Sequence, residues 1–399
     1  MKFAIKKINV TPDRPCRMAG YNRAENSTGV LDPIEINAIA VEVRGEQYII
    51  GILDCIHLNE EFCSSVRMET AKKLSLDPEH ITISAIHSHS APSYFKMTFE
   101  DNVVEPDLVR QVHEQMVHGL TQAAASMTEG SVTMEKAQIE GLYGNRNIKG
   151  GAEDKQVSLF RFYNKEGKLS GALFHLSAHP TILNGSNYLL SADLIGHVRA
   201  KLQDALGCPV AVVNGCCGDV STRFYRSLSG TQELEFTAGS IVEQFFAKKK
   251  PCVLTGDSAS GFSFRLTSRF DAATDPDWKR LLAEVEQDDS PMRDFFLERL
   301  ERKKNFGAYD LDLIAQIRRF GNLLIVVLPG DILSKFGLQI KKAFPELEVM
   351  IICYSNTYCN YLVPEDEYGL YFETFNSRLA KGEADRFIQE VIRRARQLS

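Results

Sequence analysis

The sequence predicts a single α/β domain in which a mixed β-sheet is covered by helices on both faces. Short apolar runs alternate along the chain with segments of helical periodicity, a pattern typical of layered α/β proteins. The composition of the 399 residues, 44% hydrophobic and 25% charged, is that of a globular protein with a sizeable core. No Pro/Gly/Ser-rich linker or sharp change in composition separates two halves, so residues 1–399 are treated as one domain.

Six apolar runs are expected to form strands, and a polar residue follows each of them. In chain order the runs and the residues that follow are Tyr48–Leu53 before Asp54, Ile81–Ile86 before His87, Ala172–Ala178 before His179, Val210–Val213 before Asn214, Leu323–Leu328 before Asp331, and Val349–Cys353 before Asn356. Open α/β sheets bind ligands beyond the carboxyl ends of their strands, so distant residues are expected to meet there. A hairpin loop at Asn164–Gly167 predicts an antiparallel pair, which makes the sheet mixed.

Helical periodicity is found between these strands and near the C-terminal end. Helices are predicted at Glu60–Leu74, Asp107–Met127, Leu194–Leu206, Gln232–Lys249, Ser334–Phe344 and Glu383–Leu398. A charge-rich segment at about 270–306 contains the only tryptophan, Trp278, with Leu281, Leu282 and Val285 at helical spacing. We interpret this segment as a helical insertion that forms a solvated structural excursion, with a lid or a dimer contact as the alternatives.

Charge and hydropathy argue against several classes of function. The net charge is −6 and no basic stripe is present, so nucleic acid is not an expected partner. The segment Met1–Lys7 lacks the apolar core of a signal peptide, and no run approaches the roughly 20 apolar residues needed to span a bilayer. We therefore expect a cytoplasmic protein without stable membrane association.

The strongest local signal is the His-x-His pair of Ile86-His87-Ser88-His89-Ser90-Ala91-Pro92. In extended backbone alternate side chains share a face, so His87 and His89 can point into one cleft. Such a pair indicates a metal site, and two unrelated histidines at a strand end are the alternative. His179 and Asp331 give weaker signals, since a lone histidine is often structural and an aspartate after Pro-Gly can cap a helix.

The segment Asn214–Ser221 combines small residues with an acid and a hydroxyl after a strand. It is not the Gly-x-Ser-x-Gly nucleophile elbow, and spacing assigns no general-base histidine to Ser221. Serine-hydrolase chemistry is therefore not supported directly. The sequence also lacks a His-Glu-x-x-His helix and a phosphate-binding Gly-x-x-x-x-Gly-Lys loop.

Taken in order, the motifs resemble those of the catalytic domain of the neutral/alkaline ceramidases. The similar segments, between about residues 80 and 370, are His87–Pro92, Gly144–Asn147, Ala178–Thr181, Ser191–Asp193, Gly218–Ser221, Pro329–Asp331, Ser355–Asn356, Asn360–Tyr361 and Glu367–Tyr368. The ordered set is far more specific than any one of its blocks.

The resemblance implies a zinc ion held by His87, His179, Asp331 and Tyr361. Two neutral imidazoles with oxygen donors suit zinc, with manganese or iron as alternative ions. Zinc would activate a water and polarise the scissile carbonyl. The resemblance also implies four catalytic residues, namely His89 and Arg146 as oxyanion stabilisers, Ser221 as substrate anchor or nucleophile, and Asp219 as proton acceptor or orienting group.

The chain departs from the ceramidase pattern at three points. Asp331 replaces the family's metal-binding glutamate, Thr222 replaces a proline, and neither a secretory signal nor the additional C-terminal β domain is found in the sequence. These departures favour a small soluble N-acyl or amide substrate over long-chain ceramide. We predict a zinc-dependent amidohydrolase. The alternatives are an esterase or peptidase with the same metal site, and a non-catalytic binding protein with a degenerate site.

Overall fold

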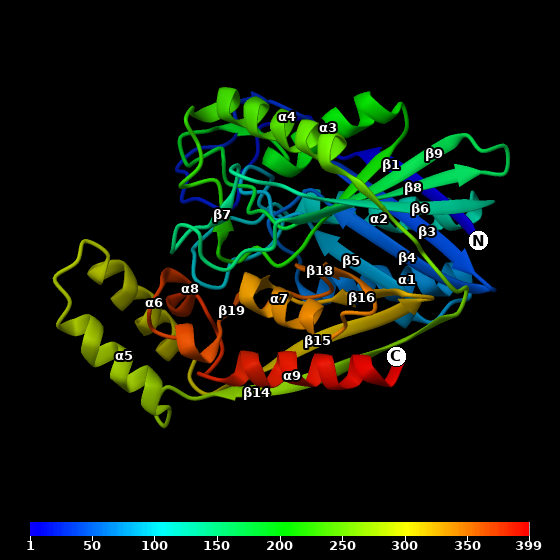
Figure 1. The fold of residues 1–399 in the computed structure, drawn as a ribbon. Coiled ribbons are helices and arrows are strands. Elements are labelled where there is room, and N and C mark those ends of the chain that lie inside the picture. Colours follow the sequence, from blue (N-terminus) through cyan, green and yellow to red (C-terminus); the bar gives the residue numbers. More distant parts are fainter. Residues whose placement is uncertain (399) are drawn as a thin grey trace.

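The computed structural model describes residues 1–398 and confirms a mixed α/β fold (Figure 1). The strand order of the larger sheet is β11 (Val210–Asn214), β9 (Leu169–Leu176), β8 (Gln156–Asn164), β6 (Thr128–Gln138), β1 (Lys2–Asn9), β3 (Glu35–Val43), β4 (Glu46–Leu53), β5 (Ile81–Ala85). A further short strand, β13 (Lys250–Cys252), pairs with β6. β4 pairs with β5 and β9 with β11 in parallel, whereas β8 and β9 form the expected antiparallel hairpin. The sheet is therefore mixed, as the sequence predicts.

A second sheet refines the predicted layering. It consists of β14 (Ala259–Phe270), β15 (Tyr309–Phe320), β16 (Leu323–Val327) and β18 (Glu348–Ile352). Ile39 and Ile50 of the larger sheet border the same internal space as Ile325 and Met350 of the second. The two sheets thus face each other, and the helices cover their outer faces. Apolar strand runs could not reveal this division, because a strand buried on both faces has the same pattern against a sheet as against a helix.

The helices on the larger sheet are α1 (Glu60–Leu74), α2 (Pro106–Ala125), α3 (Asp193–Leu206) and α4 (Gly230–Lys248). α2 packs closely on the sheet because Gly51 and Gly119 leave room, and a Cβ at Gly51 would lie 2.5 Å from the sulfur of Met116. α9 (Glu383–Ala395) packs on the second sheet, beside α7 (Ser334–Lys342) (Figure 1). These helices begin and end within a few residues of the predicted positions.

Two helices, α5 (Pro276–Glu286) and α6 (Arg293–Asn305), form an excursion at one end of the molecule (Figure 1). Trp278 and Val285 pack there with Phe270, Leu300 and Phe375 in a small core of their own. Phe375 belongs to the short helix α8 (Phe372–Phe375), so this excursion packs against a segment close to the end of the chain.

The ends of distant strands come together at one place. β5 and β11 lie at opposite ends of the strand order, yet they are in contact. The Asn214 amide donates to the carbonyls of Ile86 at 3.2 Å and Ala178 at 3.1 Å, which ties the segments after β5, β9 and β11. The convergence expected beyond the strand ends is therefore present. Within residues 1–398, no helix is long and apolar enough to cross a membrane.

Candidate metal centre

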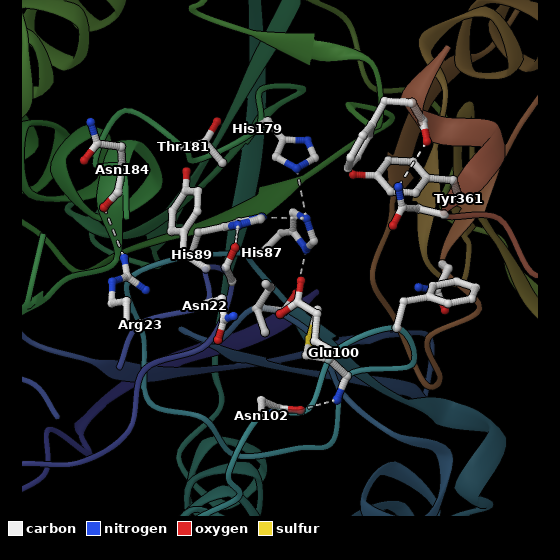
Figure 2. Close-up of a pocket in the computed structure, with 18 of the residues that line it drawn as sticks. Asn22, Arg23, His87, His89, Glu100, Asn102, His179, Thr181, Asn184 and Tyr361 are labelled. Carbon is white, nitrogen blue, oxygen red and sulfur yellow. Dashed lines mark hydrogen bonds between the residues drawn. The ribbon is translucent and has the colours of Figure 1, made fainter. Parts of the chain in front are cut away.

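A cavity of about 790 Å³ opens where these strand ends meet. His87, His89 and His179 line it, and Figure 2 shows these three side chains at its centre, with Arg23 and Asn184 to one side and Tyr361 to the other. A volume of this size is ordinary for a site that takes a small molecule.

His87 adopts a backbone conformation that the sequence did not predict. β5 ends at Ala85, and His87 has a φ of 73°, in the left-handed region that few residues other than glycine adopt. The extended alternation assumed for His87 and His89 is therefore wrong, although both side chains do reach the same cavity. The turn is held because the His87 amide donates to the carbonyl of Cys55 at 2.9 Å. Backbone strain of this kind is concentrated at functional sites.

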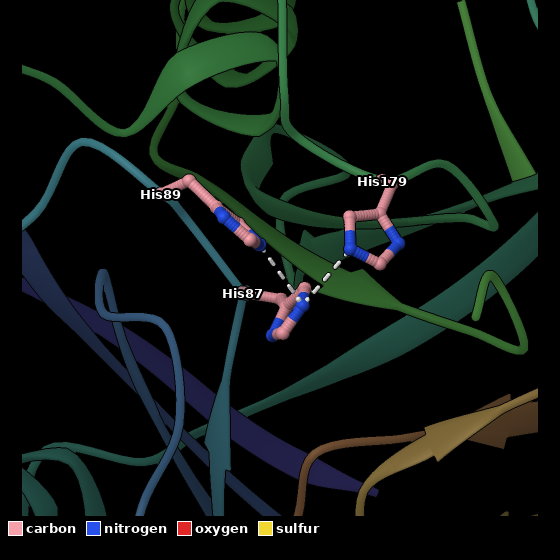
Figure 3. Close-up of side chains that lie close together, drawn as sticks. All are labelled: His87, His89 and His179. Atoms are coloured by element: carbon pink, nitrogen blue, oxygen red, sulfur yellow. Dashed lines mark hydrogen bonds between the residues drawn. The ribbon is translucent and has the colours of Figure 1, made fainter. Parts of the chain in front are cut away.

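His179 approaches the pair from β9. Its backbone amide donates to Val220 at 3.1 Å, which fixes the segment after the strand. The His87 Nε2 atom lies 3.0 Å from His179 Nε2 and 3.3 Å from His89 Nε2 (Figure 3). Three ring nitrogens from two distant parts of the chain thus converge on one point.

In each of the three rings, the hydrogen bond at Nδ1 determines which nitrogen carries the hydrogen. The Nδ1 atoms of His87, His89 and His179 lie 2.6, 3.0 and 3.0 Å from backbone carbonyl oxygens. A carbonyl only accepts, so each Nδ1 must carry the hydrogen. Burial lowers the pKa of His87 and of His89 to about 3, and that of His179 well below its usual value, so the rings are neutral. Each Nε2 therefore presents a lone pair.

Three converging lone pairs repel one another unless a cation lies between them. The three ligand atoms lie within 4.8 Å of one another, close enough to bind a single ion. Neutral imidazoles oriented by carbonyl acceptors are also the usual arrangement of histidine ligands to zinc. The residues therefore fit a metal ion, and a three-histidine set leaves a position open for water or substrate. His89, expected to stabilise an oxyanion, lies within this set.

Asp331 lies at the edge of the cluster. It begins β17 (Asp331–Ile332), which pairs in parallel with β19 (Tyr361–Leu362), and it follows Gly330, whose φ is 75°. Its Oδ1 atom lies 3.3 Å from His87 Nε2, and Tyr354 donates to the same oxygen at 2.9 Å. Tyr358 donates to Oδ2. Burial raises the pKa of Asp331 to about 6. Asp331 is not a helix cap, since α7 begins at Ser334 with Leu333 as its N-cap.

Arg146 and Tyr361 form a second polar group in the cavity. Arg146 follows β7 (Gly144–Asn145), which pairs with β12 (Val220–Ser221) and so brings residues 146 and 221 to the same cavity. The Arg146 Nη2 atom donates to the Tyr361 hydroxyl at 3.2 Å, and Nε donates to Glu373 at 2.8 Å. The Tyr361 hydroxyl, expected to bind the metal, thus accepts from Arg146.

Ser221 and Asp219 are placed differently, although they are only two residues apart. Ser221 lines the cavity, and its Oγ accepts from the Arg223 amide at 3.1 Å. Asp219 is not among the cavity-lining residues: its Oδ1 accepts from the Ser334 amide at 2.7 Å and its Oδ2 from Asn145 at 2.8 Å. Asp219 therefore ties the start of α7 to the turn that carries Arg146, which is a positioning role.

Sequence reasoning missed the residues that hold the predicted ones in place. Tyr354, Tyr358 and Glu373 are the main examples, since they fix Asp331 and Arg146. A signal was present for the tyrosines, because residues 354, 358 and 361 follow β18 closely in the sequence. Asp54, by contrast, does not line the cavity and is bound by Arg199 at 2.7 and 2.6 Å.

Sequence comparison supports the expected resemblance over part of the chain. No protein-family model matches it. It is 26% identical over 142 residues to the neutral ceramidase of Drosophila melanogaster and 25% identical over 142 residues to that of Drosophila pseudoobscura pseudoobscura. Each match covers 31% of this chain and 20% of the relative, so the chain spans about a fifth of the length of the curated relatives it matches.

Structural comparison extends the likeness to nearly the whole chain. The neutral ceramidase from Pseudomonas aeruginosa superimposes with a TM-score of 0.77 at 15% identity, covering 98% of this chain and 73% of that one. A ceramidase complexed with C2 gives 0.78 at 15% identity, with 98% and 74% coverage. The resemblance predicted from the ordered motifs is therefore confirmed as partial sequence similarity and a shared fold.

Proposed function

We propose that this protein is a zinc-dependent amidohydrolase that cleaves the N-acyl bond of a small substrate. The observation that carries the proposal is the convergence of three Nε2 lone pairs in a cavity, with every Nδ1 hydrogen already donated to a carbonyl. The partial similarity to neutral ceramidases supports an amide as the bond that is cleaved.

A zinc ion held by the three histidines would supply Lewis-acid chemistry, which acidifies water and polarises a carbonyl. The chain's own residues then orient the substrate. The Arg146 guanidinium is fixed by Glu373 and Tyr361, and it stays charged at every physiological pH. It can therefore stabilise negative charge that develops on the carbonyl oxygen. The Ser221 hydroxyl lies in the same cavity and can anchor a polar group of the substrate.

The cavity favours a small polar substrate over a long-chain lipid. Its volume of about 790 Å³ is within the range of sites for small molecules. Arginine, asparagine, histidine and acidic side chains make up much of the lining, whereas a lipid chain requires a continuous apolar wall. An N-acyl compound with a short acyl group is therefore the substrate class that we propose.

The test is metal analysis of the purified protein and its variants after zinc is supplied. We expect about one zinc per chain in the wild type, and loss of both zinc and amide hydrolysis in His87→Ala and His179→Ala. His118→Ala, which removes an exposed histidine of α2, is the matched control and should keep both. Wild-type protein that binds no zinc would sink the hydrolase proposal and favour a non-catalytic binding protein.

The same measurement assigns the role of Asp331. If Asp331 contributes only a negative charge beside the ion, Asp331→Asn should weaken zinc binding without abolishing it. Complete loss of zinc in this variant would make Asp331 a fourth ligand. Paired ester and amide substrates with one acyl group, assayed in parallel, would show which bond is preferred.

A further inference from the structure

Four arginines that line the cavity form no ion pair between their guanidinium group and a carboxylate within residues 1–398. They are Arg17, Arg23, Arg223 and Arg226. Other arginines of the lining are paired with acids, as Arg302 is with Asp101 at 2.7 Å and with Glu298 at 2.8 Å. The positive charge of the cavity lining is thus only partly compensated by ion pairs.

Arg23 is the clearest case because it is only 4% exposed. Its guanidinium donates to three backbone carbonyls, those of Asn187 at 2.7 Å, Ala19 at 3.0 Å and Asn184 at 3.3 Å. Carbonyls satisfy the N–H groups but leave the charge itself uncompensated, and burial of an unpaired charge is costly. The carboxylate of Asp193 acts on Arg23 from a distance, but it accepts from three backbone amides and forms no ion pair with it.

Arg223 and Arg226 extend this charge towards the mouth of the cavity. Both are exposed and lie just after Ser221, and within residues 1–398 neither guanidinium forms an ion pair. Arg23 lies over the ring of Tyr21, with its Cζ atom 4.9 Å from the ring centroid. The Tyr21 ring in turn lies 5.3 Å from that of His89. Arg23 therefore lies close to the histidines, and Arg223 and Arg226 line the same cavity.

We propose that Arg23, Arg223 and Arg226 form a subsite for an anionic group, a carboxylate in the simplest case, on the substrate whose amide is hydrolysed at the histidines. This inference rests on the proposed function and narrows its substrate class to N-acyl amino acids and similar acidic amides. Figure 2 shows Arg23 on the opposite side of the three histidines from Tyr361, which leaves the histidines between the two ends of the cavity. Guanidinium groups bind carboxylates through paired, charge-assisted hydrogen bonds.

Three compounds of matched length test the subsite on the zinc-loaded protein. N-hexanoylglycine carries a carboxylate on the amine half, adipic acid mono-ethanolamide carries one on the acyl half, and N-hexanoylethanolamine carries none. We expect kcat/KM for one of the two acids to exceed that for the neutral amide by about tenfold, mainly through KM. Whichever acid is preferred tells which half of the substrate lies against the arginines.

The variants Arg223→Gln and Arg226→Gln should each reduce this preference by about fivefold, and 0.5 M salt should reduce it in the wild type. Arg110→Gln is the matched control, because Arg110 is an exposed arginine of α2 that pairs with Asp107 and does not line the cavity. Equal rates for all three compounds, or variants that behave like the control, would overturn the subsite and leave the amidohydrolase proposal intact.

A binding measurement separates the two proposals if no amide is cleaved. Calorimetric titration with the same three compounds should then show binding of an acid but not of the neutral amide, with a loss in Arg226→Gln. That result would retain the anion subsite and reject amide hydrolysis. Failure of both acids to bind would reject the subsite as well.

Discussion

The floor and the outer wall of the cavity are built on different principles. The floor consists of His87, His89, His179 and Asp331, which follow buried strands and are held by backbone carbonyls or buried hydroxyls. The outer wall consists of the α6 residues 295, 298, 299 and 302, of which Glu298 and Arg302 pair with each other near the surface, whereas Arg299 is buried and donates to the Phe99 carbonyl. Exposed ion pairs contribute at most about 1 kcal/mol each. The Arg302–Glu298 pair can therefore be replaced with little cost in stability, whereas His87, His179 and Asp331 of the floor are buried.

The two regions are nevertheless connected through α8. Phe295 of the wall stacks on Phe372 with ring centroids 5.5 Å apart, and the adjacent Phe296 of α6 stacks on Phe375 at 3.9 Å. The same short helix carries Glu373, which holds Arg146 beside the floor. The comparison thus teaches that α6, through α8, bears on the position of Arg146, whereas the hydrogen bonds of the three histidines go to other segments.

The largest expected effect separates Arg146 from the metal cluster. Arg146→Ala should lower kcat by about 10²- to 10³-fold, because it removes a preorganised charge at the developing oxyanion. Zinc content should remain at the wild-type level, since no nitrogen of the three-histidine cluster bonds to Arg146. Steady-state kinetics with parallel metal analysis measures both quantities.

Glu373→Gln is the companion variant for this test. It keeps the size of the side chain but removes the charge that holds the guanidinium, so its kcat should lie between those of the wild type and Arg146→Ala. If either variant loses zinc to the extent of His87→Ala, Arg146 is needed for the geometry of the three histidines. The separation of Arg146 from the histidines would then be rejected.

The next effect concerns His175, which lies in the buried contact between the two sheets. His175 of β9 donates from Nε2 to the Ile351 carbonyl of β18 at 2.9 Å, which joins the two sheets, and burial lowers its pKa to about 4. Because the unfolded chain takes up this proton near pH 6.5, folding stability should fall as the pH decreases from about 6.5 to 4. The loss attributable to this residue is roughly 3 kcal/mol when complete.

Urea unfolding at several pH values measures this dependence. His175→Gln keeps a donor for the carbonyl but does not titrate, so its stability should change less between pH 7 and pH 5 than that of the wild type. The same slope in both proteins would mean that other buried groups, such as His57, dominate the acid response, since burial lowers the pKa of His57 to about 4 as well.

The sequence predicted the fold class and most of the floor, because both depend on local patterns. Apolar runs and helical periodicity located the main strands and helices, and His87, His89, His179 and Asp331 stood out as polar residues at strand ends. The layering into two sheets was not predictable, since pairing between strands is set by contacts distant in sequence. The left-handed conformation of His87 was missed for a similar reason, because only its surroundings stabilise it.

Roles that depend on tertiary contacts were also beyond the sequence. Asp219 lies in a matching motif, but its contacts show that it positions α7 and Asn145. Asp331 was weighed as a helix cap, whereas Asp219 accepts from the first helical amide of α7. Arg23, Arg223 and Arg226 gave no signal, because an arginine is recognised as unpaired only when its neighbours are known.

The smallest expected effect tests whether the wall reaches Arg146 through α8. Phe296→Ala removes one ring of the 3.9 Å stack with Phe375 and should destabilise α6 and α8 by about 1 kcal/mol, since Phe296 is only half-buried. If α8 then holds Glu373 less firmly, kcat should fall by about three- to tenfold with zinc content unchanged. Phe236→Ala, on an exposed face of α4, is the matched control. Hydrogen exchange should show faster exchange in α6 and α8 of the Phe296 variant alone. Faster exchange with an unchanged kcat would mean that Glu373 is held by Arg146 and Asn147 without help from the wall.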